Sequence, residues 1–346
     1  MTKGFVSKLS TAGIAILAAG LILAGCGSSG GSKGSSAQGG NTKQETIVLK
    51  LGHVSAPDLP YDIASKGFAK EVEERTNGKV KIEVFGGGQL GGDRDMIEQV
   101  QLGTLDFFAG STAALTNFVP EFELMDLPFL FNSHEHVYRA LDGEIGDFLN
   151  EKLEAAGFKN LGYWEQGFKN ISNNKREIRT AKDMEGIKMR IQESPLLSET
   201  YKALGATATP MPFTEVYVAI QQGVVEGYEG SIVPFSDIKL YEVQKYLSEA
   251  RISFGAAVLI MNKEKFESLD PDIQQILIEA GEKYELEERK VNQAKINELM
   301  DMVAEKGVQI TRYEELDIQS FKDAVQPVYD NYPQYKELVE KIRALE

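Results

Sequence analysis

Arg190 is the side chain whose type and setting most clearly suggest a binding function. It lies in the segment GIKMRIQESP (186–195), where Ile, Met and Ile alternate with Lys, Arg and Gln. This alternation is typical of a strand with one apolar face, and it places Arg190 on the opposite face. Gly186 and Pro195 bound the segment and hold the strand in a fixed position. A guanidinium held there offers a planar fork of donors to a carboxylate, whereas a solvated surface arginine is the alternative.

Two further cations and one histidine fall at or near the ends of predicted strands. Lys169 lies in WEQGFKNIS, and Arg94 lies in the glycine-rich segment GGGQLGGDRD (86–95). That segment lacks the GxxxxGK[ST] pattern of a phosphate-binding loop, so we interpret its glycines as a tight turn or a close approach of the backbone to a ligand. His53 follows a strand end, a position that suits either the lining of a cleft or a packing role.

The sequence offers little for catalysis or for a bound metal. His134 and His136 in SHEHVY are two residues apart, so they cannot converge on one helix face, and no third ligand is nearby. We interpret SHEHVY as a helix start capped by Ser133. The only cysteine, Cys26, precedes the predicted body, and the body itself contains no GxSxG motif or nucleophile–base pair. We predict no enzymatic activity, no cofactor and no metal.

The N-terminal part of the sequence predicts export and attachment to a membrane. Lys3 and Lys8 precede the apolar run TAGIAILAAGLILA (11–24), which is too short for a comfortable membrane-spanning helix. We predict a signal peptide at 1–25, because the LAGC sequence at its end resembles the lipobox of bacterial lipoproteins, in which the cysteine is acylated. Residues 26–44 then hold this cysteine and a flexible tether rich in Gly and Ser. We expect a body that is lipid-anchored on the outer face of the cell membrane.

The composition fits two globular domains and argues against nucleic acid as a partner. The 346 residues are 42% hydrophobic, which is enough for about two domains with substantial cores. The 52 acidic residues outnumber the 37 Lys and Arg residues, and the formal net charge is -15. Such a charge disfavours nucleic acid and anionic membrane surfaces. An anionic ligand stays compatible, because salt screens the distant acidic surface over roughly 10 Å.

The hydrophobic periodicity predicts an α/β fold with two α/β units. In the first unit we predict strands at 45–54, 79–87 and 104–110 and helices at 61–78 and 93–103. This βαβαβ order is typical of a doubly wound domain, whose ligands bind beyond the carboxyl ends of the strands. The pattern restarts with extended segments within 155–167, 186–192, 206–212 and 224–230 and helices at 194–205 and 213–223. From Asp270, apolar residues at three-to-four spacing predict a long helix, single or bent, that spans both units.

Several of these segments resemble the DctP-like solute-binding proteins of tripartite ATP-independent periplasmic (TRAP) transporters. The resemblance rests on DMEGIKMRIQESP, GATATPMPFTEVYVAIQQGVVEGYEG, LYEVQKYL and GGGQLGGDRDMIEQVQLGTLDFFAGSTAAL with LMDLPFLF. It implies a two-lobed periplasmic-binding-protein-like (flytrap) fold, with hinge strands and a long C-terminal helix, that closes around a ligand. We predict lobe I at 45–166 and about 255–295, and lobe II at 167–254 and about 296–346.

The resemblance also implies roles for individual residues. Arg190 takes the place of the arginine that clamps the ligand carboxylate, and Phe213 matches an aromatic residue that packs on the ligand. Lys169 stands where many members have a second arginine, so it keeps the charge but loses the bidentate fork. Where many members continue DGQENP, this chain reads EGYEGS (226–231), so Gly230 replaces the asparagine that contacts the ligand.

The predicted function is that of a receptor that captures an organic acid and delivers it to a TRAP membrane permease. A C4-dicarboxylate would use Lys169 as a second cation, whereas Trp164, Tyr228 and Glu229 suit a sugar acid such as a uronate. We prefer the sugar acid, because a buried Glu would repel a second carboxylate. The predicted ligand contacts are Arg190, Lys169, Phe213, Glu229, Tyr228, Gly230, Ser231, His53, Arg94, Trp164 and Ser111.

Two other functions use the same features. A ligand sensor for a membrane kinase needs the same flytrap as a transport receptor. A surface enzyme acting on acidic sugars needs two carboxylates across the cleft, and Glu226 with Glu229 is the pair that the sequence offers. We expect a monomer, since the sequence has no long exposed apolar stripe.

Overall fold

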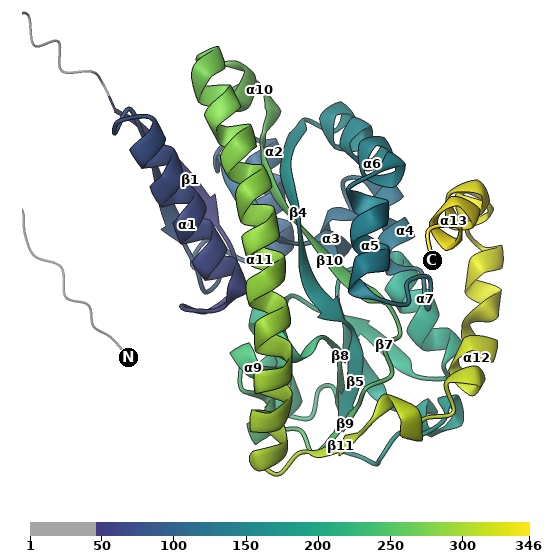
Figure 1. Ribbon diagram of the computed structural model, residues 1–346. Helices are drawn as coiled ribbons and strands as arrows, with labels where there is room; N and C mark the ends of the chain where they lie inside the picture. The colour runs from purple at the N-terminus through teal and green to yellow at the C-terminus, as the bar shows by residue number, and fades with distance from the viewer. Residues whose placement is uncertain (1–45) are drawn as a thin grey trace, which may run out of the picture. The chain divides into compact units, whose positions relative to one another are not determined.

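The computed structural model describes residues 46–346, and Figure 1 shows their arrangement. The predicted signal peptide, the predicted lipidation site Cys26 and the tether lie outside the described residues. None of the helices within 46–346 combines the length and the apolar character that a bilayer-spanning segment needs.

Sheet A contains five strands in the order β2 (Val80–Phe85), β1 (Ile47–Gly52), β3 (Phe107–Ser111), β10 (Phe254–Asn262) and β4 (Phe158–Phe168). β1 pairs in parallel with β2 and β3, with α1 (Pro60–Arg75) and α2 (Asp93–Gln101) as the crossovers. β10 inserts antiparallel between β3 and β4. Apolar side chains fill both faces of the sheet, since Phe107 and Phe108 of β3 point into different core clusters.

Sheet B contains six strands in the order β11 (Gln309–Thr311), β9 (Tyr246–Ser248), β5 (Asn170–Asn173), β8 (Gly227–Gly230), β6 (Lys188–Ile191) and β7 (Thr207–Pro210). β6 is an inner strand that pairs in parallel with β7 and β8. Met189, Arg190 and Ile191 are all buried. The alternation in this strand therefore predicts the facing of Arg190 correctly, but that face is covered rather than solvated.

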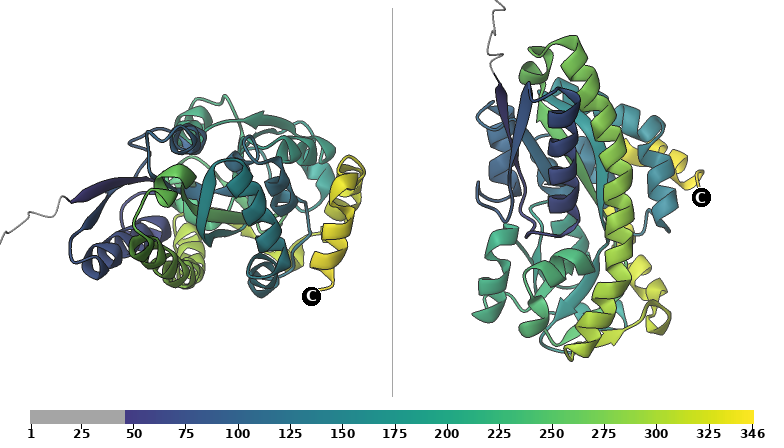
Figure 2. Two further views of the ribbon diagram at one scale, coloured as in Figure 1. Left: turned by 90° about the horizontal axis from the view of Figure 1, so that it is seen from above. Right: turned by 60° about the vertical axis from the view of Figure 1, so that its left-hand side comes forward.

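Two features connect the sheets. Lys169 is the single residue between β4 of sheet A and β5 of sheet B. The predicted long helix is one continuous helix, α11 (Pro271–Glu305), which contacts β4, α1 and α9 (Ile232–Asp237). Figure 2 shows α11 running beside α1. Gly281 allows the close approach of α11 to β4, because a Cβ there would lie 2.2 Å from the carbonyl oxygen of Leu161. The predicted α/β fold with a long C-terminal helix is confirmed.

The remaining helices cover the sheets and close the chain. They are α3 (Thr112–Leu115), α4 (Glu123–Asp126), α5 (His134–Leu141), α6 (Glu144–Ala155), α7 (Pro195–Ala203), α8 (Val216–Gln221), α10 (Lys263–Glu267), α12 (Ile318–Asp330) and α13 (Lys336–Arg343). Ser133 caps α5 as predicted, since its hydroxyl accepts a hydrogen bond from the amide of His136.

The last helix, α13, packs on the segment predicted as lobe I. The carbonyl oxygen of Ile342 lies 2.7 Å from Nε2 of His136, and Lys341 pairs with Glu144. The prediction assigns residues 296–346 to lobe II, so this packing links the two predicted lobes through the end of the chain. The lobe boundaries stay predictions.

Candidate functional site

A cavity lies beyond the strand ends, between the segment that follows β1 and the ends of β6 and β8. Its apolar lining residues are Val54, Pro60, Phe213, Val233 and Pro234. Its polar lining residues are Ser55, Tyr61, Asp93, Glu165, Gln166, Gln192, Tyr228, Asp237 and Asn292. The lining residues thus come from both sheets and from four helices, α1, α2, α9 and α11. This is expected for a ligand site at the carboxyl ends of α/β strands.

Arg190 lies behind this lining rather than within it. Its guanidinium carbon is 5.4 Å from the ring centroid of Tyr228, which faces the cavity. Nε and Nη2 both donate to the carbonyl oxygen of Met211, at 3.1 and 2.8 Å. Nη1 is buried and has no hydrogen-bond partner within residues 46–346. A buried charged donor without an acceptor is costly, so this atom marks a place that suits an anionic group.

Asp93 is an acidic residue of the cavity wall whose carboxyl is acted on by the charge of Arg190. It is the first residue of α2, and its side chain is buried. Burial raises the pKa of the Asp93 carboxyl to about 7; the nearby Arg190 opposes this shift and Glu193 adds to it. Oδ1 of Asp93 has no hydrogen-bond partner in the described part of the chain. Asp93 therefore presents a carboxyl oxygen that is free to bind a ligand.

Three more lining residues carry buried polar atoms that lack a partner among residues 46–346. They are the hydroxyl of Tyr61, Oε1 of Gln192 and Oδ1 of Asn292. Buried polar groups in folded proteins are almost always hydrogen-bonded, so a cluster of unpaired ones around a cavity indicates a ligand-binding site. The cluster contains both donors and acceptors, which suits a ligand with hydroxyl groups.

Lys169 is engaged elsewhere. Its ammonium lies 3.0 Å from Oδ1 of Asp126 and 3.1 Å from Oε1 of Glu229, and all three side chains are 1% exposed. Burial lowers the pKa of Lys169, but Asp126 and Glu229 raise it further, so the net direction is upward. Neither Lys169 nor Glu229 lines the cavity. This placement gives no support to Lys169 as a second cation for the ligand or to Glu229 as part of its polar wall.

The structure brings only some of the predicted contacts to the cavity. Phe213 and Tyr228 line it, and the hydroxyl of Ser111 accepts a hydrogen bond from Nε2 of the lining residue Gln192 at 3.0 Å. Gly230 lies against the Tyr228 hydroxyl. Ser231 lines a separate pocket.

The other predicted contacts lie apart from the cavity. Trp164 belongs to the core and packs on Tyr61 with ring centroids 5.8 Å apart. His53 is fully buried and is not part of the lining; burial lowers its pKa to about 4, although Asp62 opposes this shift. Arg94 is exposed and lies 3.9 Å from Glu193. Glu226, half of the proposed catalytic pair, binds Lys175 at 2.9 Å.

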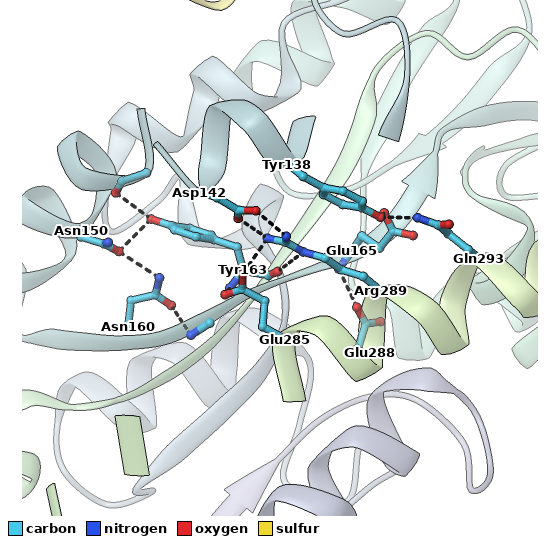
Figure 3. Close-up of polar contacts among 12 residues, drawn as sticks. Tyr138, Asp142, Asn150, Asn160, Tyr163, Glu165, Glu285, Glu288, Arg289 and Gln293 are labelled. Carbon is cyan, nitrogen blue, oxygen red and sulfur yellow. Dashed lines mark hydrogen bonds and ion pairs between the residues drawn. The ribbon is translucent and has the colours of Figure 1, made fainter. Parts of the chain in front are cut away.

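Glu165 holds the far wall of the cavity in a fixed geometry. Its carboxylate accepts hydrogen bonds from Asn292 Nδ2 at 2.9 Å and from the hydroxyl of Tyr138, and it lies 2.9 Å from Nδ1 of His134. Its backbone amide donates to Glu288 at 2.9 Å. Figure 3 shows Glu165 of β4 with Tyr138 of α5 and Glu288 of α11. With its carboxylate bound on both oxygens, Glu165 is a fixed acceptor in the wall.

Next to this wall lies a cluster around Arg289, in which every guanidinium nitrogen donates a hydrogen bond (Figure 3). Nη1 and Nη2 of Arg289 donate to the two oxygens of Asp142 at 2.9 and 2.7 Å, and Nε donates to the carbonyl oxygen of Tyr163 at 3.0 Å. Nη2 also lies 2.9 Å from Glu285. This arginine fastens α11 to β4 and to the end of α5.

Sequence reasoning does not identify Asp93, Tyr61, Gln192 and Asn292. Asp93 directly precedes Arg94, the residue selected from the same segment. Successive helix residues point in different directions, so only one of the two can face the cavity. The apolar residues Met96, Ile97 and Val100 are buried on the inner side of α2, and their spacing from Asp93 is a signal that could have favoured it.

Comparisons with known proteins find similar proteins that match most of this chain. The family described as bacterial extracellular solute-binding protein, family 7 (DctP), matches residues 51–335. The chain is 32% identical to the 2,3-diketo-L-gulonate-binding periplasmic protein YiaO of Escherichia coli, over 80% of this chain and 84% of that protein. It is 38% identical to the C4-dicarboxylate-binding periplasmic protein DctP of Rhodobacter capsulatus, over 66% and 69%.

A solved structure is similar over nearly its whole length. It is a TRAP periplasmic solute-binding protein from Polaromonas sp. JS666 bound to D-erythronate. The TM-score is 0.83 at 35% sequence identity, and the match covers 86% of this chain and 98% of that one.

Proposed function

Because this chain belongs to the DctP family of extracellular solute-binding proteins, we propose that it is a TRAP receptor that binds an organic acid through Arg190. The receptor delivers the acid to the membrane permease subunits of the transporter and performs no chemistry on it. We further propose that Cys26 carries the lipid that anchors the receptor to the outer face of the membrane, and that the body is a monomer.

The observation that carries the proposal is the unpaired Nη1 of Arg190. The side chain is 2% exposed, and Met211 occupies two of its donors while Nη1 has no acceptor within residues 46–346. A ligand carboxylate at the adjoining end of the cavity supplies the acceptor. A charge-assisted hydrogen bond of this kind is stronger in a buried site than at the surface.

The charges around the cavity favour an acid with one carboxylate and several hydroxyl groups. Among the described lining residues, Asp93, Glu165 and Asp237 are acidic and none is Lys or Arg. The buried Lys169 is balanced by two carboxylates of its own. A second ligand carboxylate would therefore meet acidic groups without a free cation to pair with. A sugar acid is our preferred ligand class, in line with the ligands named for YiaO and for the Polaromonas structure.

The test is the Arg190→Ala variant, titrated calorimetrically with a panel of aldonates, uronates and C4-dicarboxylates. We expect affinity for the acid that binds the wild type to fall by at least about 2 kcal/mol, or about thirtyfold, because a buried charge partner is removed. The circular dichroism spectrum and the cooperativity of unfolding should not change.

Arg94→Ala is the matched control, since Arg94 is near the cavity wall in sequence but exposed. It should bind as the wild type does. An Arg190→Ala variant with wild-type affinity would overturn the carboxylate clamp. Binding of no acid by the wild type would overturn the receptor assignment itself.

A further inference from the structure

Asp93 occupies a defined place in the cavity wall. Its carboxyl lies against β3, where a Cβ on Gly110 would come within 2.7 Å of Oδ1. A side chain at Gly110 would therefore displace the carboxyl, so the glycine makes room for it. Oδ1 is buried and unpaired in the described chain, while the residue faces the cavity together with Tyr61 and Phe213.

Asp93 and Arg190 influence each other electrostatically but do not form an ion pair. The positive charge of Arg190 acts on the Asp93 carboxyl, yet no guanidinium nitrogen lies within 4.0 Å of it. Each residue instead keeps one buried atom without a partner in the described chain, Nη1 on Arg190 and Oδ1 on Asp93. The two unpaired atoms belong to neighbouring groups, so one ligand can satisfy both.

We propose that Asp93 and Arg190 together select 2-hydroxy acids, in which the hydroxyl group is on the carbon next to the carboxylate. Arg190 Nη1 binds the carboxylate, and Asp93 Oδ1 binds the 2-hydroxyl group. The inference rests on the proposed function, since it assumes that Arg190 binds the ligand carboxylate. A hydroxyl can donate to or accept from Asp93, whereas a second carboxylate is repelled by it and a methylene leaves Oδ1 unpaired.

This arrangement makes Asp93 the residue that determines specificity. Three other polar lining groups come from different elements, with Gln166 in β4, Asn292 in α11 and Asp237 at the end of α9. They suit hydroxyl groups beyond the second carbon. The charge of Arg190 acts directly on the carboxyl of Asp93.

The experiment compares acids that differ only at the second carbon. D-Erythronate is paired with 3,4-dihydroxybutanoate, and D-gluconate with 2-deoxy-D-gluconate, in calorimetric titrations of the wild type, Asp93→Ala and Asp93→Asn. The wild type should bind the 2-hydroxy member of the pair it recognises about 10- to 100-fold more tightly, because the deoxy acid leaves Oδ1 unpaired. Asp93→Ala should reduce that preference to within about threefold, and Asp93→Asn should restore part of it, since its amide oxygen can still accept.

The outcomes separate this inference from the proposed function. Equal binding of both members of each pair by the wild type would overturn the inference while leaving the receptor assignment intact. A preference that survives in Asp93→Ala would do the same, as would binding of dicarboxylates but of neither pair. Binding of no acid, or wild-type binding by Arg190→Ala, would overturn both. If Asp93→Ala does not fold, the wild-type comparison and Asp93→Asn decide the matter.

Discussion

Arg190 and Arg289 are buried to a similar degree, but they differ in how many of their guanidinium nitrogens have a hydrogen-bond partner in the protein. They are 2% and 3% exposed. Arg289 donates from all three of its nitrogens, to both oxygens of Asp142 and to the carbonyl of Tyr163 (Figure 3). Arg190 uses two nitrogens on one carbonyl oxygen, that of Met211, and leaves Nη1 unpaired within the described chain.

The difference shows that burial of a charge does not by itself indicate a binding site. A buried cation whose donors are all used by the protein holds elements together, and Arg289 joins α11 to β4 and α5. A buried cation with an unused donor beside a cavity is prepared for an external partner. By this criterion Lys169 belongs with Arg289, because two carboxylates of the protein already surround its ammonium.

Removing the charge of Lys169 should give the largest effect on stability. Lys169→Met leaves Asp126 and Glu229 fully buried without a cation, so the free energy of unfolding should fall by about 3 to 5 kcal/mol. Urea denaturation at pH 8 measures this loss. The loss should be smaller at pH 5, because burial raises the pKa of Asp126 and, without Lys169 to oppose this, the carboxyl can then take up a proton.

The exposed Lys175, whose side chain is 53% exposed in its pair with Glu226, provides the control for Lys169. Lys175→Met should change the free energy of unfolding by less than about 1 kcal/mol. If Lys169→Met unfolded like the wild type but lost ligand affinity, Lys169 would belong with Arg190, as the family resemblance implied, and not with Arg289.

Removing Arg289 should have a smaller but clear effect. Arg289→Ala leaves Glu285 and the Tyr163 carbonyl without their hydrogen-bond donor. Asp142, whose side chain is 45% exposed, can form hydrogen bonds with solvent water instead. We expect a loss of about 2 to 3 kcal/mol in the free energy of unfolding. Burial raises the pKa of Glu285 to about 7 even beside Arg289, so Glu285 in the variant should be protonated at neutral pH. Ligand affinity of the folded variant should match the wild type; a large loss of affinity with unchanged stability would reverse the roles of the two arginines.

The sequence predicts most of the fold because most of its signals are local. The alternating and helical periods place β1, β2, α1, α2 and α11 within a few residues of their observed bounds. β10 is missed because FGAAVLIMN is continuously apolar and has no period to read. Its position between β3 and β4 depends on pairing with strands more than 80 residues away in the chain. A local sequence pattern carries no information about such pairing.

The site is less predictable because the hydrogen-bond partners of a polar side chain depend on the tertiary structure. The sequence indicates Arg190, since a guanidinium within a rigid strand is unusual, and the resemblance indicates Phe213. The partner that occupies Lys169, Asp126, is 43 residues distant in the chain. Nothing near Asp93 in the sequence shows that its carboxyl is unpaired. Whether a polar atom has a partner could be judged only from the structure.

The smallest expected effect concerns the ionisation of Asp93 in the ligand-free protein. Its pKa in the folded state is about 7, against an ordinary value of 3.8, because burial outweighs the attraction of Arg190 while Glu193 adds to the shift. The folded state therefore holds this proton where the unfolded state has lost it, and this group makes stability fall as the pH rises from 3.8 to about 7. Asp93→Asn removes that dependence, so the melting temperature of the variant should exceed that of the wild type by a few degrees at pH 8 and match it near pH 4.

The charged and titratable groups that act on Asp93 are Arg190, Glu193, Tyr61 and Tyr228, and Asp93→Asn leaves all of them in place. Glu98→Gln on the exposed side of α2 is the control, and its melting temperature should follow the wild type at both pH values. If Asp93→Asn melted below the wild type at pH 8, the Asp93 carboxylate would be ionised and stabilised by Arg190 in the free protein. Arg190 would then be satisfied internally like Arg289, and a ligand would have to displace Asp93 before its own carboxylate could bind.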